Sequence, residues 1–442
     1  MPRQPRHSMP AWLTLAILTA MVAAAAEVTI QIEPDPEGAL IGPYPATANC
    51  HGLRRHSPND PRWDQAMKEL FEGNLLVILE KARPEPAADG SFWETEAIDT
   101  FVDRARSDWG VDALCFLPQW SIEGWDGKRA PPDDLFQAAA EAFLQLVGRY
   151  APPGPRHITY WLCNDEWPCD GYGSDHPDEF AARYAWLVRE AKKVNRDIKL
   201  GGPVNCWPNA GIQRALIEAC PELDFIAWNL FTTMSAFTST EKVFKATRSL
   251  GANVMASRQL SQDIRGRELP VMVTSYNLNG HAWDPPDDRL ARPLGAVWNA
   301  LALTTMLRAG VSSAVIYNVR ALDCGLFGTS DSYAVSAGVL PPVSLSKVFN
   351  VRPAAHVQRF VARHFANLRT CRVRTQPTAR DLEIFAGADA EGGIGLSFVN
   401  TGDEAITINI IAPEPPRRTE LIPFQLPLHV LKCDEYGIAV GQ

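Results

Sequence analysis

The segment Tyr160–Trp167, with the sequence YWLCNDEW, places two carboxylic acids between two tryptophans. A carboxylic acid that aromatic rings shield from water has a raised pKa, and it can then donate a proton to a leaving group near neutral pH. Successive residues of a strand point in opposite directions, so we expect Glu166 rather than Asp165 to face the site unless the strand bulges. The alternative is that both residues are solvated acids of a loop.

Aromatic and amide residues also follow other segments that have the apolar composition of buried strands. Aromatic rings with a few polar groups are typical of small-molecule sites, and they suit sugars, whose ring faces are apolar and whose edges carry hydroxyls. A tryptophan is highly buried on average, so each ring has core packing as an alternative role. The predicted substrate-binding residues are Trp120, Trp161, Trp167, Trp207, Trp228, Asn229, Ser275, Tyr276 and Asn277.

These residues come at the ends of eight short apolar segments, which alternate with segments of helical periodicity. One predicted helix begins at Pro177, and another covers 289–308 and ends at Gly310. An open doubly wound sheet is the alternative, but residues 49–53 (NCHGL) are not the glycine-rich loop usual after its first strand. We therefore predict the α/β class and a (β/α)8 TIM barrel, with its site at the carboxyl ends of the strands. The predicted strands are 46–53, 74–80, 111–117, 157–163, 198–202, 223–229, 270–274 and 311–318.

The segment Tyr160–Trp167 resembles the strand-four motif of the retaining TIM-barrel glycoside hydrolases. Among them it is most similar to family 39, the β-xylosidase and α-iduronidase type, whose motif has a tyrosine, a tryptophan, an asparagine and then the acid/base glutamate. The similarity continues more weakly in 198–203 (IKLGGP), in 224–226 (DFI), and in a trailing β-rich domain. The resemblance implies hydrolysis of O-glycosyl bonds, with Glu166 as the general acid/base.

The chain departs from this family at several positions of the motifs. Asp165 stands where the family has asparagine, and Trp167 stands where it has proline. On strand seven the family has a nucleophilic glutamate after threonine, whereas this chain has Ser275 after Thr274. A serine hydroxyl without a base cannot replace a carboxylate that attacks an anomeric carbon. Retaining hydrolysis needs two carboxyls about 5 Å apart, and the motif does not supply this pair.

Three interpretations remain open. In the first, the protein is a glycosidase whose second carboxylate comes from another loop, with Asp323 as first choice and Asp284, Glu80 or Glu123 as further suppliers. A separation of about 6.5–9.5 Å would then indicate an inverting enzyme. In the second, it is a catalytically inactive barrel that binds a glycan. In the third, the barrel carries other hydrolytic or lyase chemistry, because a fold does not determine a function.

The two ends of the chain predict its domains and its compartment. Two arginines followed by the uncharged run 11–26 (AWLTLAILTAMVAAAA) are typical of a secretory signal peptide, so we expect a secreted or periplasmic protein with no membrane attachment after cleavage. An uncleaved anchor is the alternative, which the short run disfavours. We predict a signal peptide at 1–26, the barrel at 27–362 and a β-sandwich at 363–442. The segment Val28–Glu33 can also join the β-sandwich.

Charge and cysteines restrict the partners. The formal net charge is −9 and no basic run occurs, which disfavours nucleic acid and anionic membranes as partners. The expected partner is a glycan, on the grounds of the aromatic residues and the resemblance given above. The nine cysteines have no paired CxxC spacing, so neither a metal site nor a cofactor is predicted. We expect the disulfides Cys163–Cys206, between consecutive strand ends, and Cys371–Cys433, within the β-domain.

Overall fold

The computed structural model describes most of the chain. Its described residues are 26–51, 61–83, 86–120, 130–166, 172–281, 287–320, 325–328, 350–378, 381–402, 406–411, 430–434 and 437–441. The predicted signal peptide therefore lies almost wholly outside the described residues, and so do Trp167 and three of the suggested second carboxylates, Glu123, Asp284 and Asp323.

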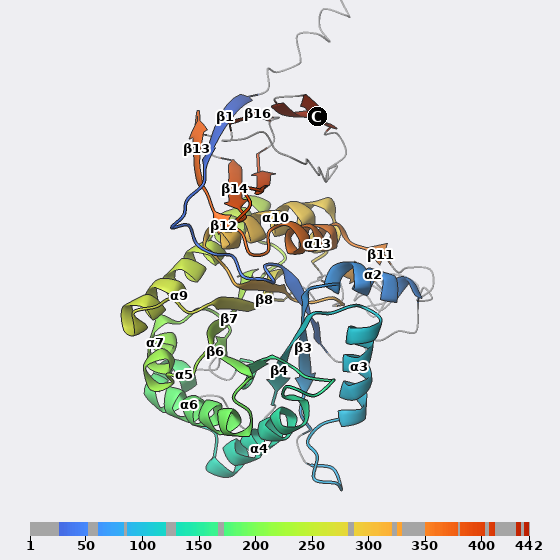
Figure 1. Cartoon of the computed structure of the whole chain (residues 1–442), viewed down its shortest axis with the longest axis vertical. Helices are drawn as coiled ribbons and strands as arrows, with labels where there is room; N and C mark the ends of the chain where they lie inside the picture. Colours follow the sequence, from blue (N-terminus) through green and yellow to red (C-terminus); the bar gives the residue numbers. More distant parts are fainter. Residues whose placement is uncertain are drawn as a thin grey trace, which may run out of the picture. The chain divides into compact units, whose positions relative to one another are not determined.

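Eight parallel strands form a closed barrel in the order of the sequence, as predicted (Figure 1). The last barrel strand pairs with the first, in the register Thr47 with Val315 and Ala48 with Ile316, and this pairing closes the barrel. The strands are β2 (Thr47–His51), β3 (Leu75–Lys81), β4 (Ala113–Gln119), β5 (Tyr160–Leu162), β6 (Lys199–Asn205), β7 (Phe225–Thr233), β8 (Val271–Asn279) and β9 (Ser313–Ile316).

Helices surround the barrel, and the ends of two of them follow the sequence signals. Helix α6 begins with Pro177 at its first turn and has Lys192 and Lys193 in its last turn, where cations suit the helix dipole. The segment predicted as one helix over 289–308 is instead a 3₁₀ turn, η2, followed by α10. The break falls before Pro293, because the residue before a proline is disfavoured in the helical region. The described helices are α2 (Pro61–Phe71), α3 (Thr95–Ser107), α4 (Asp133–Tyr150), α5 (Tyr172–Asp175), α6 (Pro177–Val194), α7 (Ala210–Ala219), α8 (Thr240–Thr247), α9 (Ser249–Arg265), η2 (Arg289–Ala291), α10 (Pro293–Arg308) and α13 (Pro353–His364).

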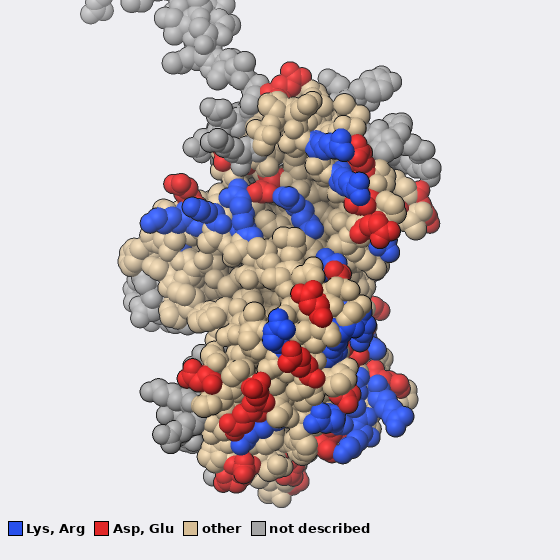
Figure 2. Space-filling view, turned by 90° about the vertical axis from the view of Figure 1, so that its left-hand side faces the viewer, with Lys and Arg blue, Asp and Glu red and all other residues tan. Residues whose placement is uncertain are grey.

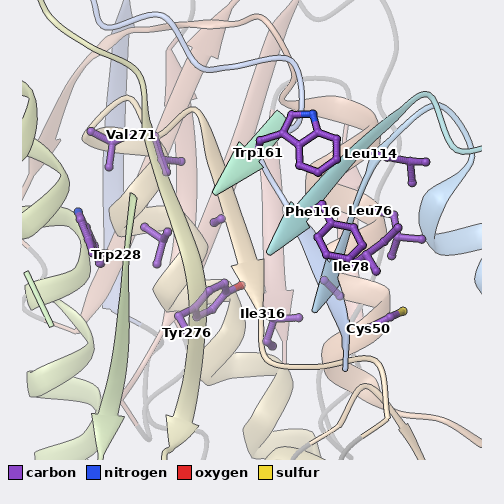
Figure 3. Packing of buried hydrophobic residues seen from close by; sticks show 14 of the residues in the cluster. Cys50, Leu76, Ile78, Leu114, Phe116, Trp161, Trp228, Val271, Tyr276 and Ile316 are labelled. Atoms are coloured by element: carbon purple, nitrogen blue, oxygen red, sulfur yellow. The ribbon is translucent and has the colours of Figure 1, made fainter. Parts of the chain in front are cut away.

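Strand alternation divides the buried apolar residues into two cores. In β3, Leu75, Val77 and Leu79 face the barrel interior, whereas Leu76 and Ile78 belong to the layer between the strands and the helices. The interior core takes apolar residues from seven of the eight strands, from β3 to β9. Figure 3 shows part of the larger outer layer. One side of each strand therefore packs against the helices, and the other side faces the barrel interior. Only side chains on the interior side can line the mouth of the barrel.

The C-terminal part of the chain is rich in β-strands, as expected. The first strand of the chain, β1 (Ala26–Glu33), pairs in parallel with β16 (Ile406–Ile411), so the expectation that Val28–Glu33 joins this domain is confirmed. Two small sheets result, one ordered β13-β1-β16-β18-β17 and one ordered β12-β14-β15. The remaining strands are β10 (Phe327–Gly328), β11 (Asn350–Val351), β12 (Arg369–Thr370), β13 (Arg372–Gln376), β14 (Leu382–Ala388), β15 (Ile394–Asn400), β17 (Val430–Asp434) and β18 (Gly437–Gly441).

The chain divides into two compact units. One contains the barrel and comprises 34–372 and 383–399, and the other comprises 1–33, 373–382 and 400–442. Within the described residues, no helix is both long and apolar enough to span a bilayer. Figure 2 shows one face of the molecule, on which basic and acidic side chains are interspersed and not separated into regions of one sign.

Candidate functional site

Asp165 and Glu166 lie just beyond the carboxyl end of β5, and the neighbouring strands hold their backbone. The Asp165 amide donates to the carbonyl of Pro118 in β4 at 2.8 Å, and the Glu166 amide donates to that of Val204 in β6 at 3.0 Å. Glu166 has φ 56° and Val204 has φ 55°, values that are rare for residues with a side chain and are real outliers for β-branched ones. Two strained residues joined by a hydrogen bond are typical of a functional site.

Both carboxylates meet at one amide. The Asn229 Nδ2 group of β7 lies 2.9 Å from Glu166 Oε1 and 3.2 Å from Asp165 Oδ1. The expectation that only one of the two acids faces the site is therefore wrong. Regular alternation applies only inside a strand, and β5 ends at Leu162, three residues before the acids. The left-handed backbone at Glu166 then turns its side chain toward the same partner as Asp165.

Thr274 of β8 orients the Asn229 amide. Its hydroxyl lies 2.7 Å from Asn229 Oδ1, so the amide oxygen is occupied and the NH2 group faces the acids. This orientation is the one that the chemistry requires, because an ionised carboxylate only accepts hydrogen bonds. Asn229 is 1% exposed, so this polar arrangement is held below the surface.

Burial and the neighbouring acid perturb the Asp165 carboxyl. Desolvation is the main cause that raises its pKa, the charge of Glu166 raises it further, and the hydrogen bond from Asn229 lowers it. The net result is a pKa well above the ordinary range of an aspartate. The two acids titrate as a pair, and this pair keeps one proton to a higher pH than two separate carboxyls would.

Ser275 lies on the inner side of β8 at the mouth of the barrel. Its hydroxyl accepts a 3.0 Å hydrogen bond from Asn49 Nδ2 of β2, although β9 separates the two strands in the barrel. Both side chains must therefore point inward. Register shifts between β8 and its neighbours occur at this level, and such bulges are frequent next to active sites. Within the described residues the Ser275 hydroxyl contacts this amide and neither an acid nor a histidine.

Buried amide groups with an unpaired atom surround the mouth. Buried polar atoms normally have a partner, and leaving one without it costs about 1–3 kcal/mol, so we expect water or a hydroxyl-bearing ligand to supply the partner. Five strand ends, those of β2, β4, β5, β6 and β9, contribute such an atom. At these five strand ends, the side-chain amide atoms without a hydrogen-bond partner among the described residues are Asn49 Oδ1, Gln119 Oε1, Asn164 Nδ2, Asn205 Oδ1 and Asn318 Oδ1. Sequence reasoning did not select them, although an amide at each strand end was the available signal.

Three of the aromatic residues predicted to bind substrate lie elsewhere. Trp161, Trp228 and Tyr276 are each 0% exposed and belong to the outer layer between barrel and helices (Figure 3). Trp161 stacks on Phe116 at 5.8 Å between ring centroids. The Trp228 indole donates to Ser257 of α9 at 3.2 Å, and the Tyr276 hydroxyl donates to α10. The prediction that these rings line the mouth is wrong, because each follows or precedes an inward residue of its strand.

Two other predicted rings and a predicted amide lie at or just after the carboxyl ends of strands. Trp120 is half-buried just after β4, and its amide donates to Asn164 Oδ1 at 2.8 Å. Trp207, after β6, is 54% exposed. Asn277 of β8 is buried, and its Nδ2 group donates to the carbonyl of Tyr317. Sequence reasoning missed Phe237, which is 84% exposed in the segment after β7. These three rings therefore follow the carboxyl ends of β4, β6 and β7, and those of Trp207 and Phe237 are exposed.

Neither predicted disulfide forms. Cys163 and Cys371 are free thiols, whereas Cys206 is disulfide-bonded. Cys163 is buried in the outer layer beside Tyr184 of α6, whose hydroxyl accepts from the Cys163 amide at 3.2 Å. Burial raises the pKa of the Cys163 thiol, which keeps it protonated and unreactive. The proximity of strand ends was therefore an insufficient signal, because the direction of the side chain decides the pairing.

A cavity of about 360 Å³ lies at the opposite, amino-terminal end of the barrel. Its polar lining groups bind one another, with the Tyr44 hydroxyl donating to Asp112 and Arg359 donating to Glu69. Paired groups of this kind stabilise the fold and leave little for a ligand to satisfy. In TIM-barrel enzymes the site is at the carboxyl end, where this structure has its unpaired amides. We therefore place the candidate site around Asp165, Glu166 and Asn229.

Replacing Asp165 by asparagine should stabilise the protein at alkaline pH. Because the folded state raises the pKa of Asp165, its contribution to stability is complete below the unfolded pKa of about 3.9 and is lost as the pH rises through the folded value. Asp165→Asn removes this loss and keeps an oxygen for Asn229. We expect a gain in stability at pH 8 that shrinks toward pH 4. Melting temperatures measured from pH 4 to 9 test this, with Asp197→Asn on the surface as the control. A gain that does not vary with pH would contradict it.

Comparisons with known proteins identify the fold. No protein-family model matches the sequence, and no curated protein matches it. Solved structures do match over most of their length. The family 51 α-L-arabinofuranosidase AbfB from Bifidobacterium longum is 13% identical, with 92% of each chain covered and a TM-score of 0.60. A family 30 subfamily 8 xylanase, Xyn30A from Clostridium acetobutylicum, is 11% identical, with 88% of this chain and 87% of that chain covered and a TM-score of 0.58.

A glucosidase from Croceicoccus marinus is 14% identical, with 88% of each chain covered and a TM-score of 0.57. At such identities a structural match establishes the fold and leaves the residues of the site to be argued from this chain alone. The chain thus has the barrel architecture of TIM-barrel glycoside hydrolases, followed by small β-sheets.

Proposed function

We propose that this protein is a secreted glycoside hydrolase-like protein that acts on a glycan at the carboxyl-end mouth of its barrel. Glu166 is the general acid/base of this proposal. The observation that carries it is the meeting of Asp165 and Glu166 on the buried amide of Asn229. A pair of coupled carboxyls keeps one proton to a higher pH than a single carboxyl does, and a glycosidic oxygen needs a proton as its bond to the sugar breaks.

The surroundings of the pair support a carbohydrate ligand. Several buried amide atoms around the mouth lack partners among the described residues, and sugar hydroxyls both donate and accept hydrogen bonds. The exposed rings of Trp207 and Phe237 follow the carboxyl ends of β6 and β7, and they offer apolar faces to a sugar. The fold similarity to glycoside hydrolases agrees with this choice of ligand. Secretion rests on the sequence of residues 1–26 alone.

Binding can be tested with defined oligosaccharides. Isothermal titration of the full chain with xylohexaose, cellohexaose and chitohexaose should detect binding of at least one of them. Trp207→Ala and Phe237→Ala should weaken this binding, because an exposed ring contributes to a site only through its ligand. Trp161→Phe is the matched control, since that ring is buried against Phe116. If none of these sugars binds, the result contradicts the proposal that the ligand is a glycan. If Trp161→Phe weakens binding as much as Trp207→Ala, the placement of the site is wrong.

A catalytically inactive glycan-binding barrel is the second candidate, and Ser275 is the observation that favours it. If only a nucleophile is missing, Ser275→Glu should create hydrolysis of activated aryl glycosides, whereas the neutral variant Ser275→Gln should not. Asp323→Asn tests the remaining route, in which another loop supplies the second carboxylate. A wild type that is already active, and that loses activity with Ser275→Glu, would contradict the inactive barrel.

A further inference from the structure

The two acids of the site lie on the same side of it. Both are bonded to the single NH2 group of Asn229, at 3.2 Å for Asp165 and 2.9 Å for Glu166. In two-carboxylate glycosidases the acid and the nucleophile or base act from different sides of the reacting carbon, and a sugar ring fits between them. A pair joined by one amide leaves no space for a ring. Asp165 therefore cannot serve as the facing carboxylate for Glu166.

The other described residues at the mouth do not supply a facing carboxylate. Ser275 has a neutral hydroxyl that Asn49 binds. Asp287 is buried and engaged by Arg289 Nε at 2.8 Å and by Asn279 Nδ2 at 2.9 Å. Glu80 follows Leu79 in β3 and so belongs to the outward phase of that strand, because Leu79 faces the interior. Within the part of the chain that the structure describes, the acid has no protein nucleophile opposite it.

A substrate can bring its own nucleophile. In 2-acetamido-2-deoxy sugars the acetamido group is attached to C2, next to the anomeric carbon, and its carbonyl oxygen reaches that carbon by closing a five-membered ring. Such a reaction needs one proton donor for the leaving group and one hydrogen-bond acceptor for the acetamido N–H. Two adjacent carboxyls on one side of the site match these two needs. Intramolecular attack also carries the large entropic advantage of a reaction between groups that are already held together.

We propose that the site hydrolyses β-glycosides of 2-acetamido-2-deoxy sugars and that the acetamido oxygen is the nucleophile. This inference rests on the proposed function, since it assumes that Glu166 is the general acid of a glycan site. When the substrate binds, the single proton of the pair lies on Glu166. The Asp165 carboxylate accepts the hydrogen bond of the acetamido N–H and so holds the acetamide beneath the anomeric carbon. Asn229 keeps the two acids in register.

The steps balance without a further reactant except water. The acetamido oxygen donates an electron pair to the anomeric carbon, the glycosidic C–O bond breaks, and the leaving oxygen takes the proton of Glu166. The product is an oxazolinium ion, whose N–H proton is shared with the Asp165 carboxylate. Water then attacks the anomeric carbon as Glu166 takes its proton, the ring C–O bond opens, and the acetamide is restored. Two inversions give net retention of configuration.

Buried unpaired groups next to the acids supply the second observation that points to a ligand. Asn164, which is 1% exposed, directly precedes Asp165, and its Nδ2 has no partner among the described residues. Asn205, which is 3% exposed, follows Val204, whose carbonyl holds the Glu166 amide, and its Oδ1 is likewise unpaired. One free donor and one free acceptor therefore adjoin the carboxyl pair. A sugar with both an amide and hydroxyls can satisfy both of them.

The test compares matched 4-nitrophenyl glycosides on the full chain. The substrates are the β-anomers of N-acetylglucosamine and N-acetylgalactosamine, their α-anomers, and the corresponding glucosides and galactosides with a 2-hydroxyl. We expect hydrolysis of at least one β-acetamido substrate, at least about 100-fold faster than its 2-hydroxy counterpart. The α-anomers should not react, because the acetamido oxygen attacks only from the face opposite the leaving group.

Fluorination of the acetamide identifies the nucleophile. Successive N-fluoroacetyl, N-difluoroacetyl and N-trifluoroacetyl substrates have a progressively weaker carbonyl nucleophile, so kcat/KM should fall along the series. Asp165→Asn should lower kcat on the acetamido substrate by about 10–100-fold, because its neutral amide stabilises the oxazolinium charge poorly. A flat dependence on fluorination would overturn the inference.

The outcomes distinguish a failure of this inference from a failure of the proposed function on which it rests. Hydrolysis of the 2-hydroxy glycosides at equal or higher rates overturns the acetamido mechanism and supports the proposed glycosidase. No hydrolysis together with oligosaccharide binding overturns the mechanism and leaves the glycan-binding barrel. Neither hydrolysis nor binding overturns both.

Discussion

Glu166→Gln should lower kcat/KM by about 10²–10⁴-fold on a glycoside with a poorly activated leaving group, because glutamine cannot donate the catalytic proton. The amide oxygen of the variant can still accept from Asn229, which binds Glu166 Oε1 at 2.9 Å in the wild type, so we expect the fold to persist. The loss should be much smaller on a 2,4-dinitrophenyl glycoside, whose leaving group departs without protonation. This dependence on the leaving group is a signature that simple misfolding does not produce.

The matched control is Glu141→Gln, on the exposed face of α4. It makes the same chemical change far from the mouth and should leave both substrates unaffected. Steady-state kinetics on the two glycosides, with melting temperatures for all three proteins, provide the measurement. An equal loss on both substrates, or no loss on either, would remove Glu166 from the role of general acid.

Trp161→Ala should reduce the free energy of unfolding by about 3–5 kcal/mol, the usual cost of removing a large buried ring. The ring is 0% exposed, stacks on Phe116 and lies 6.0 Å from the ring of Phe143 in α4. Its indole also donates to the carbonyl of Ile158 at 2.8 Å. The variant therefore leaves a cavity between the barrel and a helix, and it removes one buried hydrogen bond.

Trp207→Ala is the opposite case, because this ring is 54% exposed. Its removal should change the stability by no more than about 0.5 kcal/mol. Urea unfolding followed by circular dichroism distinguishes the two variants. If Trp161→Ala left the unfolding midpoint unchanged, the ring would not be a packing residue, and its predicted place at the mouth would have to be reconsidered.

Local patterns were sufficient to predict the barrel. Short apolar segments without alternation indicate strands buried on both faces, and eight of them in alternation with helices leave few architectures open. The helix that begins at Pro177 follows from a signal within a few residues. The side of the barrel that carries Asp165 and Glu166 follows from the fold rule for strand ends. These features depend on neighbours in the sequence, which a reader of the sequence can see.

The direction of each side chain was decided by the tertiary structure. Trp161, Trp228 and Tyr276 were predicted at the mouth on residue type alone, yet strand phase sends all three to the helices. A shift of one residue exchanges the two faces of a strand, so composition cannot decide which face a ring takes. The same ambiguity led to the incorrect pairing of Cys163 with Cys206.

The shared contact of the two acids with Asn229 also depends on the folded barrel. Asp165 and Glu166 converge because Glu166 has a left-handed backbone, which its hydrogen bond to Val204 in the next strand helps to hold. Asn229, which joins them, is more than sixty residues away in the sequence and is oriented by Thr274 of a further strand. The sequence by itself determined the strands and hence which segments end at the mouth of the barrel. The closure of eight strands decided which of them meet, because contacts across a barrel depend on register and strain and not on sequence distance.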